Sequence, residues 1–384
     1  MKIGLFTDTF APQINGVVTV VQMMVRQFEA LGHEPVVFAP AYPDQPQDES
    51  NKVWRFPSRK VHFHPESRLT WPYRRKVPTV LSELDIVHSH TPFSLGLLAI
   101  WTAHHYHVPH VHTYHTYFSE YRHYIPRPIR PPKRVAEGIS RAFCDRCQWV
   151  LAPSEEMKEE LERYGVRTPV EAMPFGIDLD AFQRPLKFDL RAELHLSPQT
   201  KLLLSAGRLG PEKNFAFVVE AFARIKRAHD DAALAIVGDG PSRHELERQA
   251  EALGLQADVH FLGYIDRAKL IDSYRQAELF VFASKTETQG IVLLEAQAAG
   301  TPVVAIGEMG VCDVVESGRG GLLVPEDLEA FATAALSLLT EPERRRAFAQ
   351  NALDMARRHS ARTSCQGLLA CYEKLLKRDA VLSS

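Results

Sequence analysis

Short apolar segments alternate with longer amphipathic segments along almost the whole chain. The apolar segments are rich in β-branched residues and predict buried strands, while the amphipathic segments predict helices. In the first half we expect strands at residues 3–7, 34–39, 86–89, 108–113, 149–152 and 170–173, and helices at 17–31, 94–104, 135–147 and 155–164. Such alternation is typical of a parallel sheet that is covered by helices on both faces.

The alternation is interrupted once and then restarts. Residues 174–199 form a predicted connector, and residues 40–64, rich in Pro, Asp and Gln, a predicted mobile loop. After the connector we expect strands at 201–206, 233–237, 259–261, 279–283, 303–306 and 321–324, helices at 214–229, 242–253, 267–276 and 291–299, and three more helical stretches. The predicted fold is therefore α/β, with two doubly wound, Rossmann-like domains that face each other across a cleft.

Composition limits the possible classes of protein but does not indicate a function. The chain has 384 residues, 45% of them apolar, which is enough for two cores, and its net charge of −2 gives no overall attraction to nucleic acid. Five cysteines favour the cytosol over a disulfide scaffold. We expect no signal peptide and no membrane span, because no apolar run approaches about 20 residues.

The charge is unevenly distributed along the sequence. Residues 52–146 contain 15 Lys and Arg against 6 Asp and Glu, together with 11 of the 17 histidines. Aromatic residues such as Trp71 and Tyr73 lie among these charges. The segment predicts a docking surface for an anionic partner such as a membrane, although a solvated basic face without a partner fits equally well.

Glu287 and Glu295 lie on either side of the start of a predicted helix. The preceding loop ends at Gly290, and the first N–H groups of a helix are free to bind an anion. Those groups belong to Gly290, Ile291 and Val292. Carboxylates beside a phosphate site can accept hydrogen bonds from sugar hydroxyls, although two surface glutamates at this spacing are also common.

Three other strand ends carry candidate ligand groups. Arg208 and Lys213 are suited to a diphosphate, whose departure they can stabilise without a metal ion, unless they are two ordinary surface cations. Gly238 and Gly240 let a ligand approach the backbone, and Tyr264 with Ile265 can contact a nucleotide base.

The loop after the first strand supplies Asn15 and Gly16. Their N–H groups, just before the first helix, are expected to reach the diphosphate. The loop has no GxGxxG pattern, which disfavours a nicotinamide cofactor.

His115 follows another strand and can hydrogen-bond a sugar hydroxyl. The neighbouring histidines suggest a metal site, through His88, His90, His110 and His112. We expect no metal, because alternate residues of a strand point to opposite faces and no HExxH or aspartate-rich partner is present. Cys144 and Cys147 are interpreted as packing residues within one helix.

Taken in order, these residues resemble the family-four retaining glycosyltransferases of GT-B architecture over nearly the full chain. The shared positions are Asn15-Gly16, Gly207-Arg208, Glu212-Lys213-Asn214, Gly238-Asp239-Gly240-Pro241, Gly263, Glu287-x7-Glu295 and Gly300-x-Pro302-Val303. Two further segments are most similar to the diacylglycerol glucosyltransferases, namely Tyr114-His115-Thr116 with Tyr121-x-x-Tyr124-Ile125-Pro126, and Glu287-Thr288-Gln289-Gly290.

The resemblance implies a role for each domain. Residues 1–175 are expected to bind the acceptor and residues 176–360 the nucleotide sugar, with the helix at about 361–384 packing back on the first domain. Arg208, Lys213, Gly16 and the amides of Gly290, Ile291 and Val292 then hold the diphosphate, Glu287 the donor sugar and Glu295 the ribose. His115 lies near the sugar and the acceptor, and Tyr114, Tyr117, Tyr121 and Tyr124 lie on the acceptor side.

The resemblance also implies a reaction. A hexose, glucose, moves from UDP-glucose to a membrane lipid such as diacylglycerol, with retained configuration and without a cofactor or metal ion. The enzyme is expected to be cytoplasmic and peripheral at the inner face of the membrane, and to bind no nucleic acid. Transfer to a soluble glycan or small molecule, and a sugar-nucleotide epimerase of similar architecture, stay open, as do the donor base and the oligomeric state.

Overall fold

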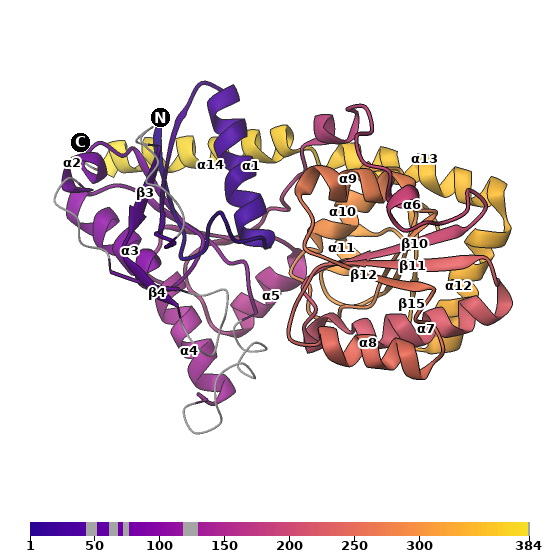
Figure 1. Cartoon of the computed structure of the whole chain (residues 1–384). Coiled ribbons are helices and arrows are strands. Elements are labelled where there is room, and N and C mark those ends of the chain that lie inside the picture. The colour runs from indigo at the N-terminus through magenta and orange to yellow at the C-terminus, as the bar shows by residue number, and fades with distance from the viewer. Residues whose placement is uncertain (44–51, 61–67, 72–76, 118–129, 383–384) are drawn as a thin grey trace. The chain divides into compact units, whose positions relative to one another are not determined.

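The computed structural model describes residues 1–43, 52–60, 68–71, 77–117 and 130–382 (Figure 1). The chain divides into two compact units. Unit 1 consists of Met1–Phe175 together with Ala361–Ser384, and unit 2 of Gly176–Ser360. Each unit is built on its own parallel sheet, so the predicted α/β fold class is confirmed.

Unit 1 has, within its described residues, a seven-stranded parallel sheet in the order β3-β2-β1-β6-β7-β8-β9. The strands are β1 (Lys2–Phe6), β2 (Glu34–Pro40), β3 (Val53–Phe56), β6 (Ile86–Ser89), β7 (His110–Thr113), β8 (Trp149–Ala152) and β9 (Val170–Ala172), with a separate antiparallel pair, β4 (Ser58–Lys60) and β5 (Arg68–Thr70). The strand order reverses between β1 and β6. Open α/β sheets bind ligands beyond the C-terminal strand ends at such a point.

The helices of unit 1 include one from the far end of the chain. They are α1 (Gly16–Ala30), α2 (Val77–Leu81), α3 (Ser94–Tyr106), α4 (Lys133–Cys144), α5 (Glu155–Arg163) and α14 (Ala361–Leu382). Helix α14 packs against α1 (Figure 1), and the ring edge of Tyr372 meets Phe28 with centroids 6.1 Å apart. The C-terminal helix therefore completes the core of unit 1.

Unit 2 has, within its described residues, a six-stranded parallel sheet in the order β12-β11-β10-β13-β14-β15. Its strands are β10 (Lys201–Ala206), β11 (Ala232–Val237), β12 (Val259–Gly263), β13 (Leu279–Phe282), β14 (Val303–Ile306) and β15 (Gly321–Val324). Its helices are η3 (Leu179–Phe182), α6 (Leu190–Glu193), η4 (Pro211–Lys213), α7 (Phe215–Ala228), α8 (Arg243–Ala252), α9 (Arg267–Gln276), α10 (Ile291–Ala298), α11 (Val311–Val314), α12 (Leu328–Thr340) and α13 (Pro342–Arg358).

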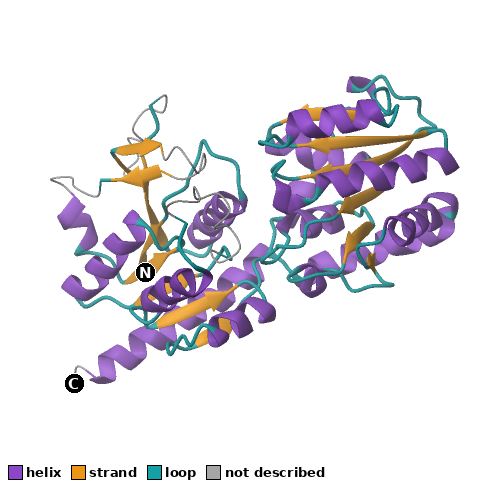
Figure 2. Cartoon of the chain, turned by 90° about the horizontal axis from the view of Figure 1, so that it is seen from below, coloured by secondary structure: helices purple, strands orange, loops and turns teal. Residues whose placement is uncertain are grey.

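Two hydrophobic cores lie on opposite faces of this sheet. Along β10, Leu203 packs into the core that contains α7 and α12, while Leu202 and Leu204 pack into the core that contains α9 and α10. Figure 2 shows helices on both sides of these strands. Strands buried on both faces read as continuous apolar runs, which is why they were visible in the sequence.

The structure contains short elements that were not predicted, such as β5, α2 and α11, and it departs from the sequence prediction in two further segments. Residues 40–64 were expected to be a loop, but they contain β3, which pairs with β2. The helix expected at 135–147 ends at Cys144, so Cys147 lies in the following loop. Both cysteines are buried, and burial raises the pKa of the Cys144 thiol to about 12, as expected for a packing residue.

Candidate active site

The donor-site residues predicted in unit 2 all lie at one edge of its sheet. The loops that follow β10, β11, β12 and β13 carry them, and these strands are parallel. The C-terminal ends of parallel strands share an edge. The structure therefore brings together Arg208, Lys213, Gly238, Gly240, Tyr264, Ile265, Glu287 and the start of α10.

Lys213 and Glu287 form an ion pair at this edge. The Lys213 Nζ lies 2.5 Å from Glu287 Oε1, and the two side chains are only 18% and 12% exposed. Strand β10 lies beside β13, so the ends of both strands meet although the residues are 74 apart in sequence. Sequence reasoning named both residues but did not pair them.

Arg208 is held in a similar way. Its Nη1 lies 3.3 Å from Oε1 of Glu212, whose side chain is nearly buried. The backbone carbonyl of Glu212 accepts a hydrogen bond from Ser284 Oγ at 3.4 Å. This contact joins the loop after β10 to the loop after β13. Both candidate cations thus have a fixed position before any ligand binds.

The N-terminus of α10 lies next to Glu287 in the chain. Gly290 is its N-cap, with φ 75° and ψ 56°, a left-handed conformation that glycine adopts without strain. No side chain caps this helix among the residues described. The first N–H groups of the helix, at Ile291 and Val292, are therefore placed to bind an anion.

Glu295 is buried at 3% exposure and has two protein partners. Arg267 Nη1 lies 2.5 Å from its Oε1, and the Tyr274 hydroxyl donates to its Oε2 at 3.1 Å. Attraction to Glu295 raises the pKa of Arg267, and burial raises the pKa of Tyr274 well above its usual value. These contacts orient the carboxylate, and each oxygen keeps a lone pair for a ligand hydroxyl.

Sequence reasoning missed Arg267 and Tyr274. The one signal was weak: Asp266 has the pattern of a helix cap, and Asp266 does accept from Lys269 N. Helix α9 thereby starts at Arg267, with its guanidinium at the same edge as Glu295.

The fold itself requires glycine at positions 238 and 240, for a reason that the sequence did not predict. A Cβ on Gly238 would lie 1.9 Å from the carbonyl oxygen of Gly207, and one on Gly240 would lie 2.4 Å from that of Leu209. The two loops are also joined by a hydrogen bond from Leu209 N to Asp239 O. These glycines let two loops pack closely, whether or not a ligand also approaches them.

The base-contact candidates differ in exposure. Tyr264 is 52% exposed, and its hydroxyl donates to the carbonyl of Asp239 at 3.2 Å. Ile265 is partly buried against the core that contains α9 and α10. Tyr264 is therefore better placed than Ile265 to offer a ring face to a base.

The loop after β1 in unit 1 contains two candidates, Asn15 and Gly16, which differ in their role in the fold. Asn15 caps α1 by accepting from Val18 N at 3.0 Å, and its Nδ2 donates to Thr9 Oγ1. A Cβ on Gly16 would meet nothing within 4 Å, and its φ is not left-handed. The fold thus uses the Asn15 side chain but does not itself require a glycine at position 16.

Asp8 anchors the same loop and was not predicted. Its buried carboxylate accepts hydrogen bonds from the hydroxyls of Thr91 and Ser94, both at 2.7 Å, and from Leu95 N at 3.0 Å. Burial raises the pKa of Asp8, whereas these hydrogen bonds oppose the rise. Asp8 joins the ends of β1 and β6 to the start of α3, at the point where the strand order reverses.

The predicted histidines cluster along β6 and β7 and in the loops that follow them, with His88, His90, His110 and His112 buried and His115 partly buried. Nδ1 of His90 lies 2.9 Å from Nε2 of His115, and the His88 and His90 rings have centroids 4.3 Å apart with planes inclined by 30°. His110 and His112 share the Ser89 hydroxyl instead. Burial lowers the pKa of all five, to about 3 for His110 and His115.

The acceptor-side tyrosines are placed less favourably. Tyr114 and Tyr117 are each 1% exposed, and the Tyr114 hydroxyl shares a hydrogen bond with Ser140 Oγ at 2.7 Å. Both rings pack inside unit 1, which does not support direct contact with an acceptor. Tyr121 and Tyr124 lie outside the described residues.

Comparison with known proteins identifies the family. Residues 14–181 match the family model described as Glycosyltransferase Family 4, and residues 187–355 match the one described as Glycosyl transferases group 1. The chain is 34% identical over 351 residues to an alpha-monoglucosyldiacylglycerol synthase of Streptococcus pneumoniae, covering 89% of this chain and 79% of the relative. The chain belongs to the family-four glycosyltransferases, which have the GT-B fold.

One further relative and one solved structure are similar to this glycosyltransferase. A GDP-mannose-dependent alpha-mannosyltransferase of Mycolicibacterium smegmatis is 29% identical over 389 residues, covering 99% of both chains. The crystal structure of Anabaena HepE in complex with UDP-glucose superimposes with a TM-score of 0.76 at 20% identity, covering 97% of this chain and 100% of the other. The second likeness shows the shared fold.

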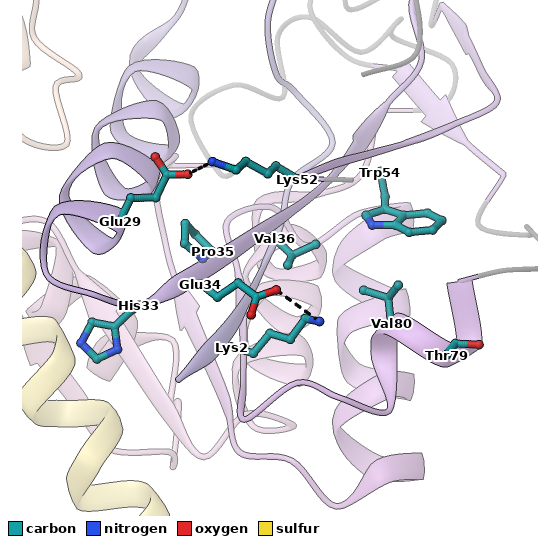
Figure 3. A pocket seen from close by; sticks show the side chains of 10 residues that line it. All are labelled: Lys2, Glu29, His33, Glu34, Pro35, Val36, Lys52, Trp54, Thr79 and Val80. Atoms are coloured by element: carbon teal, nitrogen blue, oxygen red, sulfur yellow. Dashed lines mark hydrogen bonds and ion pairs between the residues drawn. The ribbon is translucent and has the colours of Figure 1, made fainter. Parts of the chain in front are cut away.

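A hollow of about 850 Å³ in unit 1 of the glycosyltransferase is not the candidate site. It lies by the N-terminal ends of β1, β2 and β3, whereas the candidate residues follow C-terminal strand ends. Figure 3 shows that the charges in it pair with one another, Lys2 with Glu34 at 3.3 Å and Lys52 with Glu29 at 2.6 Å.

The described residues of the glycosyltransferase include neither a group of metal ligands nor a membrane-spanning helix. In the part of the chain that the structure describes, no three His, Cys, Asp or Glu side chains are grouped so as to hold a metal ion. Over the same residues, every helix is too short or too polar to cross a lipid bilayer.

Proposed function

We propose that this glycosyltransferase moves glucose from UDP-glucose to a membrane lipid such as diacylglycerol, with retained anomeric configuration and without a metal ion. The observation that carries the proposal is the Lys213–Glu287 ion pair beside the uncapped start of α10. It places a cation, free amides and a carboxylate together, and a sugar diphosphate needs all three.

The pair can serve both parts of a donor at once. An ammonium has three N–H donors, so Lys213 can donate to a phosphate oxygen while it keeps Glu287 in place. The second carboxylate oxygen of Glu287 then accepts from hydroxyls of the sugar. Arg208 and the α10 amides add positive potential at the diphosphate, which carries increasing negative charge as it departs.

Glu295 is suited to the ribose, because Arg267 and Tyr274 fix its orientation. His115 donates a hydrogen bond to the transferred sugar. A leaving phosphate oxygen takes the proton of the acceptor hydroxyl as the sugar moves, so no protein nucleophile is needed. The acceptor attacks from the side that the phosphate leaves, and the configuration is retained.

A lipid acceptor is favoured by the monoglucosyldiacylglycerol synthase relative and by apolar side chains on the surface of unit 1. Helix α3 and its N-cap expose Phe93, Leu97 and Trp101 at four-residue spacing, and α4 exposes Val135 and Ile139. Basic residues accompany them on α4, namely Lys133, Arg134 and Arg141. Apolar side chains with neighbouring cations suit a peripheral protein at an anionic membrane surface.

An acceptor-dependence assay tests the reaction. With UDP-glucose and detergent-dispersed diacylglycerol, we expect UDP release only when the lipid is present, with no loss of rate in EDTA. Proton NMR of the product should show the α-anomer. An isomeric sugar formed without an acceptor would instead indicate an epimerase, and turnover only with water-soluble acceptors would exclude the lipid.

The donor base is tested by binding alone. A ligand that binds only the folded state raises its apparent stability, so thermal shifts rank candidate donors. We expect UDP and UDP-glucose to raise the melting temperature more than GDP and GDP-mannose. The reverse order would assign the donor class of the mannosyltransferase relative.

Vesicle sedimentation tests the membrane surface. Leu97→Asp and Ile139→Asp should each weaken binding to anionic vesicles roughly tenfold, because burial of one such side chain is worth about 1.5 kcal/mol or more. Leu253→Asp is the matched control, since Leu253 is an exposed leucine of unit 2. Equal effects in all three variants, or unchanged binding, would place the membrane contact elsewhere.

A further inference from the structure

His115, which we place at the transferred sugar, is in contact with a second histidine, His90. Nδ1 of His90 lies 2.9 Å from Nε2 of His115, close enough for one hydrogen bond. On its other side, the His115 ring stacks on Phe175, with centroids 5.2 Å apart and planes inclined by 15°. These two contacts fix the plane of the ring and direct its Nε2 toward His90.

Both imidazoles are neutral at ordinary pH. Burial lowers the pKa of His115 to about 3 and the pKa of His90 well below its usual 6.5. A neutral imidazole has one N–H and one bare nitrogen, so one of the facing nitrogens donates and the other accepts. The direction of this hydrogen bond decides which nitrogen of His115 keeps a proton for the substrate.

The far nitrogen of His90 settles the direction. His90 Nε2 is buried and has no hydrogen-bond partner among the described residues. If His90 accepted from His115, its own proton would lie on Nε2 as a buried N–H without an acceptor. Proteins tolerate an unpaired acceptor more often than an unpaired N–H. The proton of His90 therefore belongs on Nδ1.

The ring on the other face of His90 offers no alternative acceptor. Both nitrogens of His88 are already engaged, Nδ1 with the Tyr372 hydroxyl at 2.6 Å and Nε2 with Thr113 Oγ1 at 2.7 Å. The His88 and His90 rings are in contact at an inclination of 30°, without a hydrogen bond between them among the described residues. His88 therefore supplies no acceptor for a proton on His90 Nε2.

We propose that His90 is a positioning residue that holds His115 in the Nδ1–H tautomer, so that His115 Nδ1 donates to a hydroxyl oxygen of the transferred sugar. The identity of that hydroxyl rests on the proposed function, whereas the tautomer does not. His115 is then a neutral donor and not a general base. Removal of the acceptor proton falls to the leaving phosphate oxygen.

Nitrogen NMR of the intact protein with ¹⁵N-labelled histidine tests the tautomer without turnover. The signals of His115, assigned by their loss in His115→Asn, should show a protonated Nδ1 and a bare Nε2 at neutral pH. A protonated Nε2 on His115 in the unsubstituted protein overturns the proposal. This measurement needs no second variant that might fail to fold.

Two substitutions then test the cause. His90→Leu removes the donor and should let the His115 proton move between its two nitrogens. His110→Leu is the matched control, because His110 is equally buried but bonds Ser89 rather than His115. His90→Asn, whose amide nitrogen replaces Nδ1, should keep the original tautomer. Unchanged His115 signals in a folded His90→Leu protein would show that His90 does not set it.

Turnover gives a separate readout. Asparagine places an amide N–H near the position of Nδ1, and glutamine near that of Nε2. His115→Asn should therefore retain about tenfold more kcat than His115→Gln, the upper range of the usual worth of one neutral hydrogen bond. Equal losses would remove the substrate-facing role of Nδ1. If no nucleotide sugar is turned over by any form, the proposed function fails, while the NMR result stands by itself.

Discussion

The two units carry opposite chemistry at the C-terminal strand ends of similar sheets. In unit 2 the polar groups there are charged and paired, as Lys213–Glu287, Arg208–Glu212 and Arg267–Glu295. In unit 1 they are, apart from the Asp8 carboxylate, neutral histidines with histidine or hydroxyl partners. Most of these side chains in both units are buried or only slightly exposed, so the difference lies in charge and not in exposure.

This difference matches the two halves of a glycosyl transfer. A departing diphosphate gains negative charge, and preformed cations and amides stabilise it most strongly where water is limited. Sugar and lipid hydroxyls are neutral, and neutral donors and acceptors satisfy them without the large cost of burying an unpaired charge. On this comparison we propose that unit 2 stabilises the leaving group and that unit 1 recognises hydroxyls.

Removal of the Glu287 carboxylate should have the largest effect. Glu287→Ala should lower kcat about a thousandfold, the upper range for one group that acts in a transition state. UDP affinity should stay the same or rise, because Lys213 loses its competing partner. Calorimetric titration with UDP and single-turnover kinetics measure the two effects. Loss of UDP binding would show that Glu287 orders Lys213 rather than binding the sugar.

The neutral histidines predict a pH dependence that is stronger in unit 1 than in unit 2. Their folded pKa values lie below the unfolded value of about 6.5, so their stability contribution is complete above that pH and is lost as the pH falls below it. Between pH 7 and 6, each fully neutral histidine should cost about 0.7 kcal/mol of the free energy of unfolding. The five histidines together should lower the free energy of unfolding by about 3 kcal/mol over this pH range.

Hydrogen exchange resolved by peptide measures this effect in each unit separately. Peptides of β6 and β7 should lose protection between pH 7 and 6, after correction for intrinsic exchange. In unit 2, burial lowers the pKa of His260 and His359, which are neither fully buried nor clustered, so its peptides are an internal reference. An equal loss of protection in both units would mean that the histidines of unit 1 do not cause the pH effect.

The sequence predicted where the site groups lie but not how they pair. Strand ends are visible because apolar runs stop at glycine, proline and polar residues, as after β10 at Gly207. Pairing depends on strand order, which local patterns do not contain. Lys213 meets Glu287 because β13 lies beside β10, although β11 and β12 come between them in the chain. The His90–His115 contact likewise needs β6 beside β7.

Side-chain direction was the other limit of the sequence. Tyr114 and Tyr117 lie in a basic, aromatic segment that predicted a surface, yet both rings are buried. A tyrosine has an apolar body and one polar atom, so it suits a core whenever its hydroxyl finds a partner, as Tyr114 does at Ser140. Nothing in the sequence separates that outcome from exposure at an interface.

Gly238 and Gly16, which looked alike in the sequence, should differ in their effect on stability. In Gly238→Ala the new Cβ would lie 1.9 Å from the Gly207 carbonyl oxygen, at a φ of 130°, so the free energy of unfolding should fall by about 3 kcal/mol. In Gly16→Ala the Cβ meets no protein atom within 4 Å, and stability should change by less than about 0.5 kcal/mol.

The Gly16→Ala substitution should lower activity although it leaves stability nearly unchanged. A methyl group there enters the space beside the first amides of α1, so kcat/KM for the nucleotide sugar should fall about tenfold if the diphosphate approaches that backbone. Chemical denaturation and steady-state kinetics on the same preparations give both numbers. A fully active Gly16→Ala protein would mean that groups of unit 2 alone hold the diphosphate. Unit 2 would then bind the whole donor and not only its leaving group.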